Sequence, residues 1–274
     1  MANRYVPVYI AQSQTPHGAV MPVFQLSRRG VLLGAIGLVW SGAALAGEIT
    51  VSAASSLTNA FKEVAQRFEQ QHPGSKVLLN FGASGALLQQ MAKGAPVDVL
   101  ASADQETMDQ AAQQGLILTS GRRNFVRNTL VVVVPAGSTR SMRGLQDLTQ
   151  PAVQKVAIGN PASVPVGRYS QRALEAAKLW PAVQAKAIHT QNVRQSLDYV
   201  ARGEVEAGFV YHTDALVQKG KVHVAFTVPL AGVIHYPIAP AANSSHIVEA
   251  RQFVNYVLSP AGQAILAQHG FLKP

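Results

Sequence analysis

Residues 48–68 read EITVSAASSLTNAFKEVAQRF, and this stretch sets a pattern that the rest of the chain repeats. Its first part, Ile49-Thr50-Val51, is apolar and β-branched, as a buried strand should be. Small residues follow at 53–56, and beyond them apolar residues recur at the spacing of one helix face: Leu57, Ala60, Phe61, Val64 and Phe68. The stretch therefore predicts a strand that turns sharply into a helix, with Ser55 and Ser56 at the turn.

This predicted turn has the chemistry of an anion site. The first N–H groups of a helix have no partner within the helix, and the helix dipole is positive at that end. Serine hydroxyls add further donors. A serine at a helix start is, however, most often an N-cap, so on these residues alone both interpretations stay open.

The same strand–turn–helix unit recurs along the chain. Residues 76–81 (KVLLNF) predict a second strand, and the small residues 82–85, which include Ser84, predict the turn into a second helix. Residues 97–101 (VDVLA) predict a third strand, with Asp104 as the N-cap of the helix behind it. Alternation of this kind implies a parallel sheet.

A second group of such units starts in the middle of the chain. Residues 129–135 (TLVVVVP) are almost continuously β-branched, which is typical of a strand buried on both faces of a sheet, and we place a crossing between two lobes there. Further strands are expected at 155–159, around 188, and at 207–211, 222–228 and 234–239. Helices are expected at 168–178, 193–202, 247–258 and 261–268, with residues 160–167 as the loop before the first of them. The strands at 222–228 and 234–239 are expected to return the chain to the first lobe.

The expected architecture is α/β with two lobes, the second inserted into the first. Residues 47–128 form the first part of lobe 1, residues 129–228 form lobe 2, and residues 229–274 return to lobe 1 with closing helices. In open α/β sheets, ligands bind at the carboxyl ends of strands. If the lobes face each other, five turns at such ends converge on one cleft: Ser55-Ser56, Ala83-Ser84, Val166-Gly167, Asn192-Val193 and Tyr211.

Composition and charge limit the function classes. The 274 residues are 48% hydrophobic and 14% charged, as in a globular protein with a substantial core. The formal charge is +9, but the densest basic group, Arg122, Arg123 and Arg127, has no aromatic ladder beside it, which argues against a nucleic-acid surface. There is no cysteine, so disulfides, thiolate metal sites and a thiol nucleophile are excluded.

The N-terminal segment predicts export. Arg28-Arg29 stands directly before an apolar run at 30–40, and Ala44-Leu45-Ala46 is an A-x-A cleavage site. The paired arginines resemble the signal read by the twin-arginine export route. We expect residues 1–46 to be a signal peptide cleaved near Ala46 and the mature protein to be periplasmic. Met21 is an alternative translation start, because the segment before the arginines is long.

Six segments together resemble the periplasmic molybdate-binding proteins, the solute receptors of molybdate ABC importers. They are ITVSAASSLTNAF, GAPVDVLASADQETMD, NTLVVVVP, VAIGNPASVPVGRYSQRAL, NVRQSLDYVARGEVEAGFVYHTDA and LSPAGQAILAQHGF, and the resemblance spans residues 48–274. It implies the two-lobed periplasmic-binding-protein fold of type II, with the ligand in the cleft between the lobes. It also implies a monomeric, non-enzymatic receptor without a cofactor, which delivers its anion to a membrane permease.

By this resemblance, the oxyanion is held by two serine hydroxyls, a tyrosine hydroxyl and backbone N–H groups. Matched position by position, the hydroxyl donors fall on Ser56, Ser84 and Tyr211, and the backbone donors fall on Val166 and Val193. Many relatives have alanine where Val166 stands, and a backbone contact tolerates that change.

Molybdate needs a site made of donors. It is a tetrahedral dianion with no proton to donate at neutral pH, so hydroxyl and backbone N–H groups suffice. None of the five turns carries Arg or Lys, and we expect helix dipoles and uncharged donors to balance the charge. Hydrogen phosphate must donate its proton and is rejected where no acceptor is present. Tungstate, nearly equal in size, should bind about as well as molybdate.

Three other functions use related residues. Sulfate is also a proton-free dianion and differs from molybdate in size. Ferric ion would need Tyr, His and carboxylate ligands together, and Tyr211-His212 is a single pair. A serine hydrolase is the alternative of another class, since 82–86 (GASGA) resembles the G-x-S-x-G nucleophile elbow except at Ala86. We expect no catalytic residue and no direct metal ligand, with molybdenum entering as the oxyanion.

Overall fold

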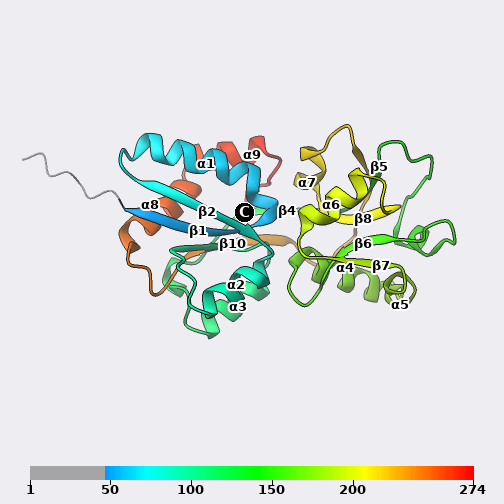
Figure 1. The fold of residues 1–274 in the computed structure, drawn as a ribbon, viewed down its shortest axis with the longest axis horizontal. Coiled ribbons are helices and arrows are strands. Elements are labelled where there is room, and N and C mark those ends of the chain that lie inside the picture. Colours follow the sequence, from blue (N-terminus) through cyan, green and yellow to red (C-terminus); the bar gives the residue numbers. More distant parts are fainter. Residues whose placement is uncertain (1–46) are drawn as a thin grey trace, which may run out of the picture. The chain divides into compact units, whose positions relative to one another are not determined.

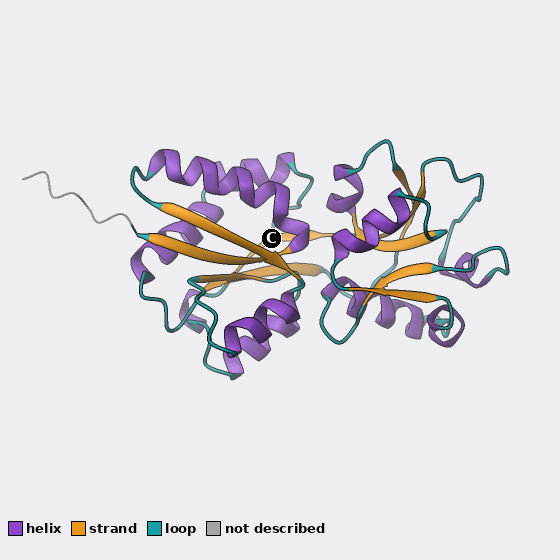
Figure 2. Cartoon of the chain, in the orientation of Figure 1, coloured by secondary structure: helices purple, strands orange, loops and turns teal. Residues whose placement is uncertain are grey.

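The computed structural model of the chain describes residues 47–274, so the predicted signal segment, residues 1–46, lies outside the described part. The described residues belong to one compact unit. They contain two five-stranded sheets, each with helices on both faces (Figure 1 and Figure 2). Among residues 47–274, no helix is both long enough and apolar enough to cross a membrane.

The first sheet has the strand order β2-β1-β3-β10-β4. Strand β1 runs parallel to β2 and β3, whereas β10 runs antiparallel to both β3 and β4. Because Ala54 pairs with Gly82, the turns that follow β1 and β2 lie side by side at the carboxyl ends of these strands. The strands are β1 (Glu48–Ala54), β2 (Lys76–Gly82), β3 (Val99–Ala101), β4 (Arg123–Asn128) and β10 (Ile234–Pro240).

Helices cover both faces of the first sheet. On one face lie α1, α8 and α9, where the rings of Phe61, Phe68 and Phe253 pack edge to face, and on the other lie α2 and α3 (Figure 1). The helices are α1 (Thr58–Gln71), α2 (Ser84–Ala92), α3 (Gln105–Gln113), α8 (Ile247–Leu258) and α9 (Pro260–Gln268), and a 3-10 turn, Ser55–Leu57, leads into α1. The helix face predicted between Leu57 and Phe68 is confirmed, since its apolar residues are all buried.

The second sheet has the strand order β7-β6-β8-β5-β9, with β6 parallel to β7 and β8 and with β5 antiparallel to β8 and β9. Its strands are β5 (Leu130–Pro135), β6 (Val156–Gly159), β7 (Ala187–Thr190), β8 (Ala207–Tyr211) and β9 (Val222–Thr227). Helices α4 and α6 cover opposite faces (Figure 1). The helices are α4 (Pro165–Ala176), α5 (Trp180–Gln184), α6 (Val193–Ala201) and α7 (His212–Val217).

The second sheet is inserted between β4 and β10 of the first. Thr129 alone separates β4 from β5, and residues 228–233 connect β9 to β10. We call the first sheet with its helices lobe 1 and the second sheet with its helices lobe 2.

The parallel pairing predicted for the first three strands is confirmed, since β1 pairs parallel with both β2 and β3. Each sheet is nevertheless mixed, because β10 in the first and β5 in the second run in the opposite direction to their neighbours. Two expectations about the strands are wrong. Strand β4 (RNFVRN) was not predicted, and its polar composition fits an edge position, where β10 pairs with one side and Arg127 forms an isolated bridge with Leu272 on the other. Strand β9 does not return to lobe 1 but forms the edge of the second sheet, so β10 alone makes the return.

The start of α4 also differs from the prediction. The helix begins at Pro165, whereas residues 160–167 were expected to be a loop with the helix starting at 168. Proline is well suited to the first helical position, because its fixed φ matches the helix and no N–H is lost. Position 167, inside the helix, requires glycine, because a Cβ there would lie 1.9 Å from the carbonyl oxygen of Gly159. The earlier start places Val166 in the first turn.

Candidate anion-binding site

A small cavity lies where helix starts from both lobes meet. None of the residues that line it is charged. All five residues expected to hold the ligand are among them: Ser56, Ser84, Val166, Val193 and Tyr211. The structure thus brings together positions that are up to 155 residues apart in the chain, from Ser56 to Tyr211.

Ser84 opens α2 and presents its hydroxyl to the cavity. The Ser84 Oγ accepts a hydrogen bond from the backbone N–H of Ala103 at 3.0 Å, and both residues line the cavity. That bond uses one of the two lone pairs of the oxygen and leaves the hydroxyl proton available to a ligand. The helix has no side-chain cap at Ala83, so Ser84 is not an N-cap here. Of the first N–H groups of α2, that of Gly85 donates to the carbonyl oxygen of Ser163.

Ser56 lies in the 3-10 turn before α1 and is 3% exposed. Its Oγ lies 3.0 Å from the hydroxyl oxygen of Tyr236, a residue of β10. Neither the 3-10 turn nor α1 has a side-chain cap, so the N-cap interpretation fails for Ser56 as well.

Tyr211 ends β8, and its hydroxyl is buried without a hydrogen-bond partner among residues 47–274. Burial raises the pKa of Tyr211 well above its ordinary value, so the phenol stays protonated. Its ring packs edge to face against Tyr236, with centroids 5.6 Å apart. Because buried hydroxyls are normally hydrogen-bonded, this free hydroxyl is well placed to donate to a ligand in the cavity.

Lobe 2 also contributes backbone donors. Val166 lies in the first turn of α4, which has no side-chain cap, and Val193 is the first residue of α6. At α6 the side chain of Asn192 accepts from the N–H of Gln195, which leaves the N–H of Val193 free of that cap. The first N–H groups of both helices lack intrahelical partners and point toward the helix start.

A family model of bacterial extracellular solute-binding proteins matches residues 49–272. This chain belongs to that family. Among curated relatives, the molybdate-binding protein of Mycobacterium tuberculosis strain H37Rv is 38% identical over 227 residues, covering 82% of this chain and 85% of the relative. That of Escherichia coli strain K12 is 34% identical over 244 residues, covering 86% and 94%.

Solved structures of similar proteins agree on the fold. The periplasmic molybdate-binding protein of Azotobacter vinelandii has a TM-score of 0.73 at 23% identity, covering 82% of this chain and 99% of that chain. The sulfate-binding protein SubI of Mycobacterium tuberculosis also has a TM-score of 0.73, at 21% identity, covering 82% and 86%. The predicted two-lobed periplasmic-binding-protein fold is confirmed for this solute-binding protein.

Two arginine–aspartate pairs of this solute-binding protein lie at the helices around the cavity, one across the lobes and one within lobe 2. Arg168 of α4 donates to Asp104 with Nη2 at 2.6 Å and Nε at 2.9 Å, and Asp104 caps α3 as predicted. Arg194 of α6 pairs with Asp214 at 2.6 Å and donates to the backbone oxygen of Ser56 at 3.3 Å. These groups surround the site but do not line it.

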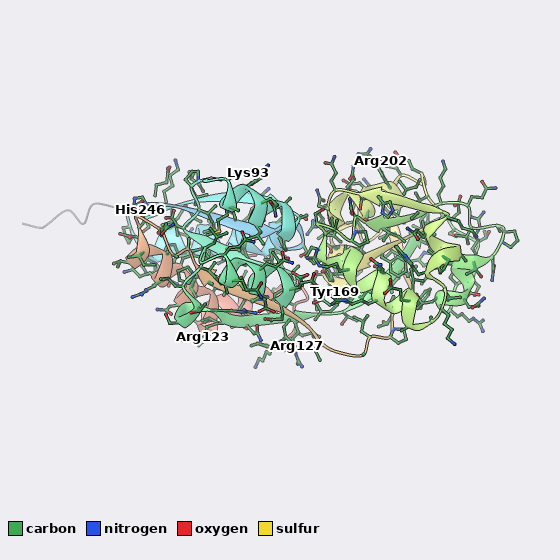
Figure 3. All side chains as sticks on the ribbon, turned by 90° about the horizontal axis from the view of Figure 1, so that it is seen from below. Lys93, Arg123, Arg127, Tyr169, Arg202 and His246 are labelled. Carbon is green, nitrogen blue, oxygen red and sulfur yellow. The ribbon has the colours of Figure 1, made fainter. Side chains whose placement is uncertain are left out.

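The remaining basic residues are dispersed. Figure 3 shows Lys93 and Arg202 far from Arg123 and Arg127, so the excess positive charge forms no single stripe along these positions. The same view shows Tyr169 of α4 close to lobe 1, and its phenol is near enough to Asp104 for that carboxylate to help raise the pKa of Tyr169. Among residues 47–274, no three His, Cys, Asp or Glu side chains are grouped as metal ligands.

Tyr236, Asn128, Arg168 and Arg194 carried no sequence signal for a role at this site. Alternation along 234–240 indicates that Tyr236 is buried, but nothing local pairs it with a serine 180 residues earlier. Arg168 and Arg194 have the spacing of exposed helix positions. Strand pairing within lobe 1 brings Asn128 and Tyr236 together behind Ser56, and the contact of the two lobes brings Arg168 and Arg194 beside the cavity.

Proposed function

We propose that this solute-binding protein is an extracytoplasmic receptor that captures molybdate and delivers it to a membrane ABC importer. The observation that carries the proposal is the composition of the cavity wall. It joins four hydroxyl side chains, those of Ser55, Ser56, Ser84 and Tyr211, to the starts of helices from both lobes and contains no charged side chain. The names of the relatives at 34% and 38% identity support the same ligand.

The geometry accounts for binding of a tetrahedral dianion. Each hydrogen bond to a charged group contributes roughly 1.5–3 kcal/mol, and each helix start about 0.3–2 kcal/mol. After the cost of ordering and closure, several such contacts leave about −8 to −11 kcal/mol, which corresponds to micromolar to roughly ten-nanomolar affinity. The donors come from both lobes, so the anion stabilises the arrangement in which the lobes are in contact.

The proposal extends to related anions. Tungstate presents the same oxygens at nearly the same radius and should bind about as well as molybdate. Sulfate is accepted by the same kind of donor but is smaller, so it fills the cavity less well. The similarity to a sulfate-binding protein at 21% identity concerns the fold alone and does not favour sulfate here.

The wider biological setting is proposed on the same basis. We place the mature, monomeric receptor in the periplasm, with residues 1–46 as an export signal cleaved near Ala46, and its partner as the permease of an importer. We divide the mature chain at residues 47–128, 129–228 and 229–274, with Thr129 and residues 228–233 as the connections. The receptor has no reaction to catalyse, and Ser84 acts as a donor and not as a nucleophile.

Calorimetric titration of the mature protein with molybdate, tungstate, sulfate and phosphate tests the proposal. Molybdate and tungstate should bind with similar affinity and raise the melting temperature, because a ligand that binds only the folded state stabilises it. Phosphate at the same concentration should do neither. Absence of molybdate binding, or phosphate binding of equal strength, would overturn the assignment.

A further inference from the structure

Three buried polar side chains form a hydrogen-bonded line that ends at the cavity. Asn128, the last residue of β4, places its Nδ2 3.3 Å from the hydroxyl oxygen of Tyr236. The hydroxyl oxygen of Tyr236 lies 3.0 Å from Oγ of Ser56. Asn128 and Tyr236 lie outside the cavity wall, whereas Ser56 is part of it.

The direction of the hydrogen bonds in this line is fixed at its outer end. The Oδ1 of Asn128 accepts from the backbone N–H of Thr129 at 2.9 Å, so the amide is oriented with Nδ2 toward Tyr236. That same Nδ2 also donates to Oγ1 of Thr213 at 2.9 Å. An amide NH₂ can only donate, so the Tyr236 oxygen must accept from it.

The direction then passes to Ser56. Burial raises the pKa of Tyr236 well above its ordinary value, so its hydroxyl keeps its proton. The Tyr236 oxygen accepts from Asn128, and Ser56 Oγ is the one acceptor bonded to the Tyr236 hydroxyl among residues 47–274, so Tyr236 donates its proton to Ser56. This bond uses one of the two lone pairs of Ser56 Oγ and leaves the Ser56 proton available to a ligand in the cavity.

We propose that Asn128 and Tyr236 are positioning residues that orient the Ser56 hydroxyl, with one lone pair taken up and the proton free for the anion, and that they thereby favour molybdate over oxyanions that carry a proton. The inference rests on the proposed molybdate-binding function. At Ser84 the backbone N–H of Ala103 has the same effect, since it donates to the serine oxygen. Each serine therefore keeps its proton for the anion and has one acceptor lone pair fewer.

The other hydroxyls in the cavity wall are those of Ser55 and Tyr211. The Tyr211 hydroxyl has no partner among residues 47–274, so its proton is also free for the anion. Hydrogen phosphate, which must donate one proton, finds fewer free acceptor lone pairs once those of Ser56 and Ser84 are partly taken up, whereas molybdate needs none.

Replacing Tyr236 tests the inference. In Tyr236→Phe, both lone pairs of Ser56 Oγ are free and its proton can turn away from the cavity, so Ser56 accepts more readily from a protonated anion. We expect molybdate affinity to fall by about five-fold, the effect of one hydrogen bond. Hydrogen phosphate at about pH 8 should gain affinity, so the ratio of molybdate to phosphate affinity should fall at least ten-fold. Calorimetric titration of the mature variant with both anions measures the ratio.

Controls separate this role from a loss of structure. Tyr256→Phe, the same change on α8 outside the site, should leave the ratio at the wild-type value. Asn128→Leu keeps the Tyr236 ring but removes its donor, and it should lower the ratio too, so the test stands if Tyr236→Phe does not fold. If both site variants lose molybdate and phosphate binding equally, or change neither, the inference is wrong. If the wild-type protein does not bind molybdate, it is the proposed function that fails.

Discussion

The hydroxyl of Tyr211 has no partner in the described part of the protein. Its removal should therefore affect molybdate affinity but not the stability of the unliganded protein. Tyr211→Phe should weaken molybdate binding by roughly 1.5–3 kcal/mol, because a hydrogen bond to a charged ligand is lost. The same change should not lower the stability of the unliganded protein, because it breaks no internal hydrogen bond. Calorimetry with molybdate and thermal unfolding without it measure the two effects separately.

Ser56→Ala is the informative comparison for Tyr211→Phe. It should also weaken molybdate binding, but it additionally breaks the bond to Tyr236 and leaves that buried hydroxyl with one partner fewer. The unliganded protein should therefore lose about 1 kcal/mol of stability in Ser56→Ala and none in Tyr211→Phe. Wild-type affinity in both variants would show that these side chains do not hold the anion.

At the scale of the element, the start of α2 approaches lobe 2 more closely than a side chain would allow. The N–H of Gly85 donates to the carbonyl oxygen of Ser163 at 3.0 Å, and a Cβ on Gly85 would lie 2.6 Å from that oxygen. Gly85→Ala should push the 160–164 loop away from α2 and weaken molybdate binding by at least about ten-fold, or ~1.4 kcal/mol. Titration measures the loss.

Gly144→Ala is the matched control, because nothing lies within 4 Å of a Cβ at Gly144 and its φ of −169° is open to any residue. This variant should bind molybdate as the wild type does. Unchanged affinity in Gly85→Ala would mean that the contact between α2 and the loop at Ser163 is not part of the bound state.

The elements themselves show what the sequence could and could not predict. The sequence pattern alone located β1, β2 and the buried face of α1, because both strands are short apolar runs and α1 buries one regular stripe of apolar residues. It did not locate β4, whose polar residues suit an edge, or the start of α4, where a proline read as a loop residue is the first of the helix. The five ligand positions were found through a resemblance, whereas the Asn128–Tyr236–Ser56 line depends on strand pairing in three dimensions.

At the scale of the whole molecule, the contacts that hold the lobes together lie beside the cavity and not in its wall. Arg168 of lobe 2 reaches Asp104 and also donates to Oγ1 of Thr107 at 2.8 Å. Arg172 pairs with Glu106, and Arg194 donates to Oδ1 of Asn59 at 2.8 Å. The Arg168 and Asp104 side chains are only 11% and 5% exposed, so solvent screens their attraction weakly.

This ion pair should set how much of the unliganded protein has its lobes in contact. Apparent affinity falls in proportion to the population of the binding-competent state, so Arg168→Met should weaken molybdate binding without removing any ligand contact. The loss should fall mainly on the dissociation rate, because the anion leaves through the open form and the interlobe pair holds the lobes closed around it. Asp104→Asn should have a similar effect, and the double variant should lose less than the sum of the two single losses, since both remove the same interaction.

Stopped-flow kinetics on the wild type and the three variants would measure the dissociation rates, and small-angle scattering of each protein without ligand would measure how far its lobes are closed. Strictly additive losses, or a variant whose dissociation rate equals that of the wild type, would mean that the lobes are held together by the anion and the backbone contacts alone.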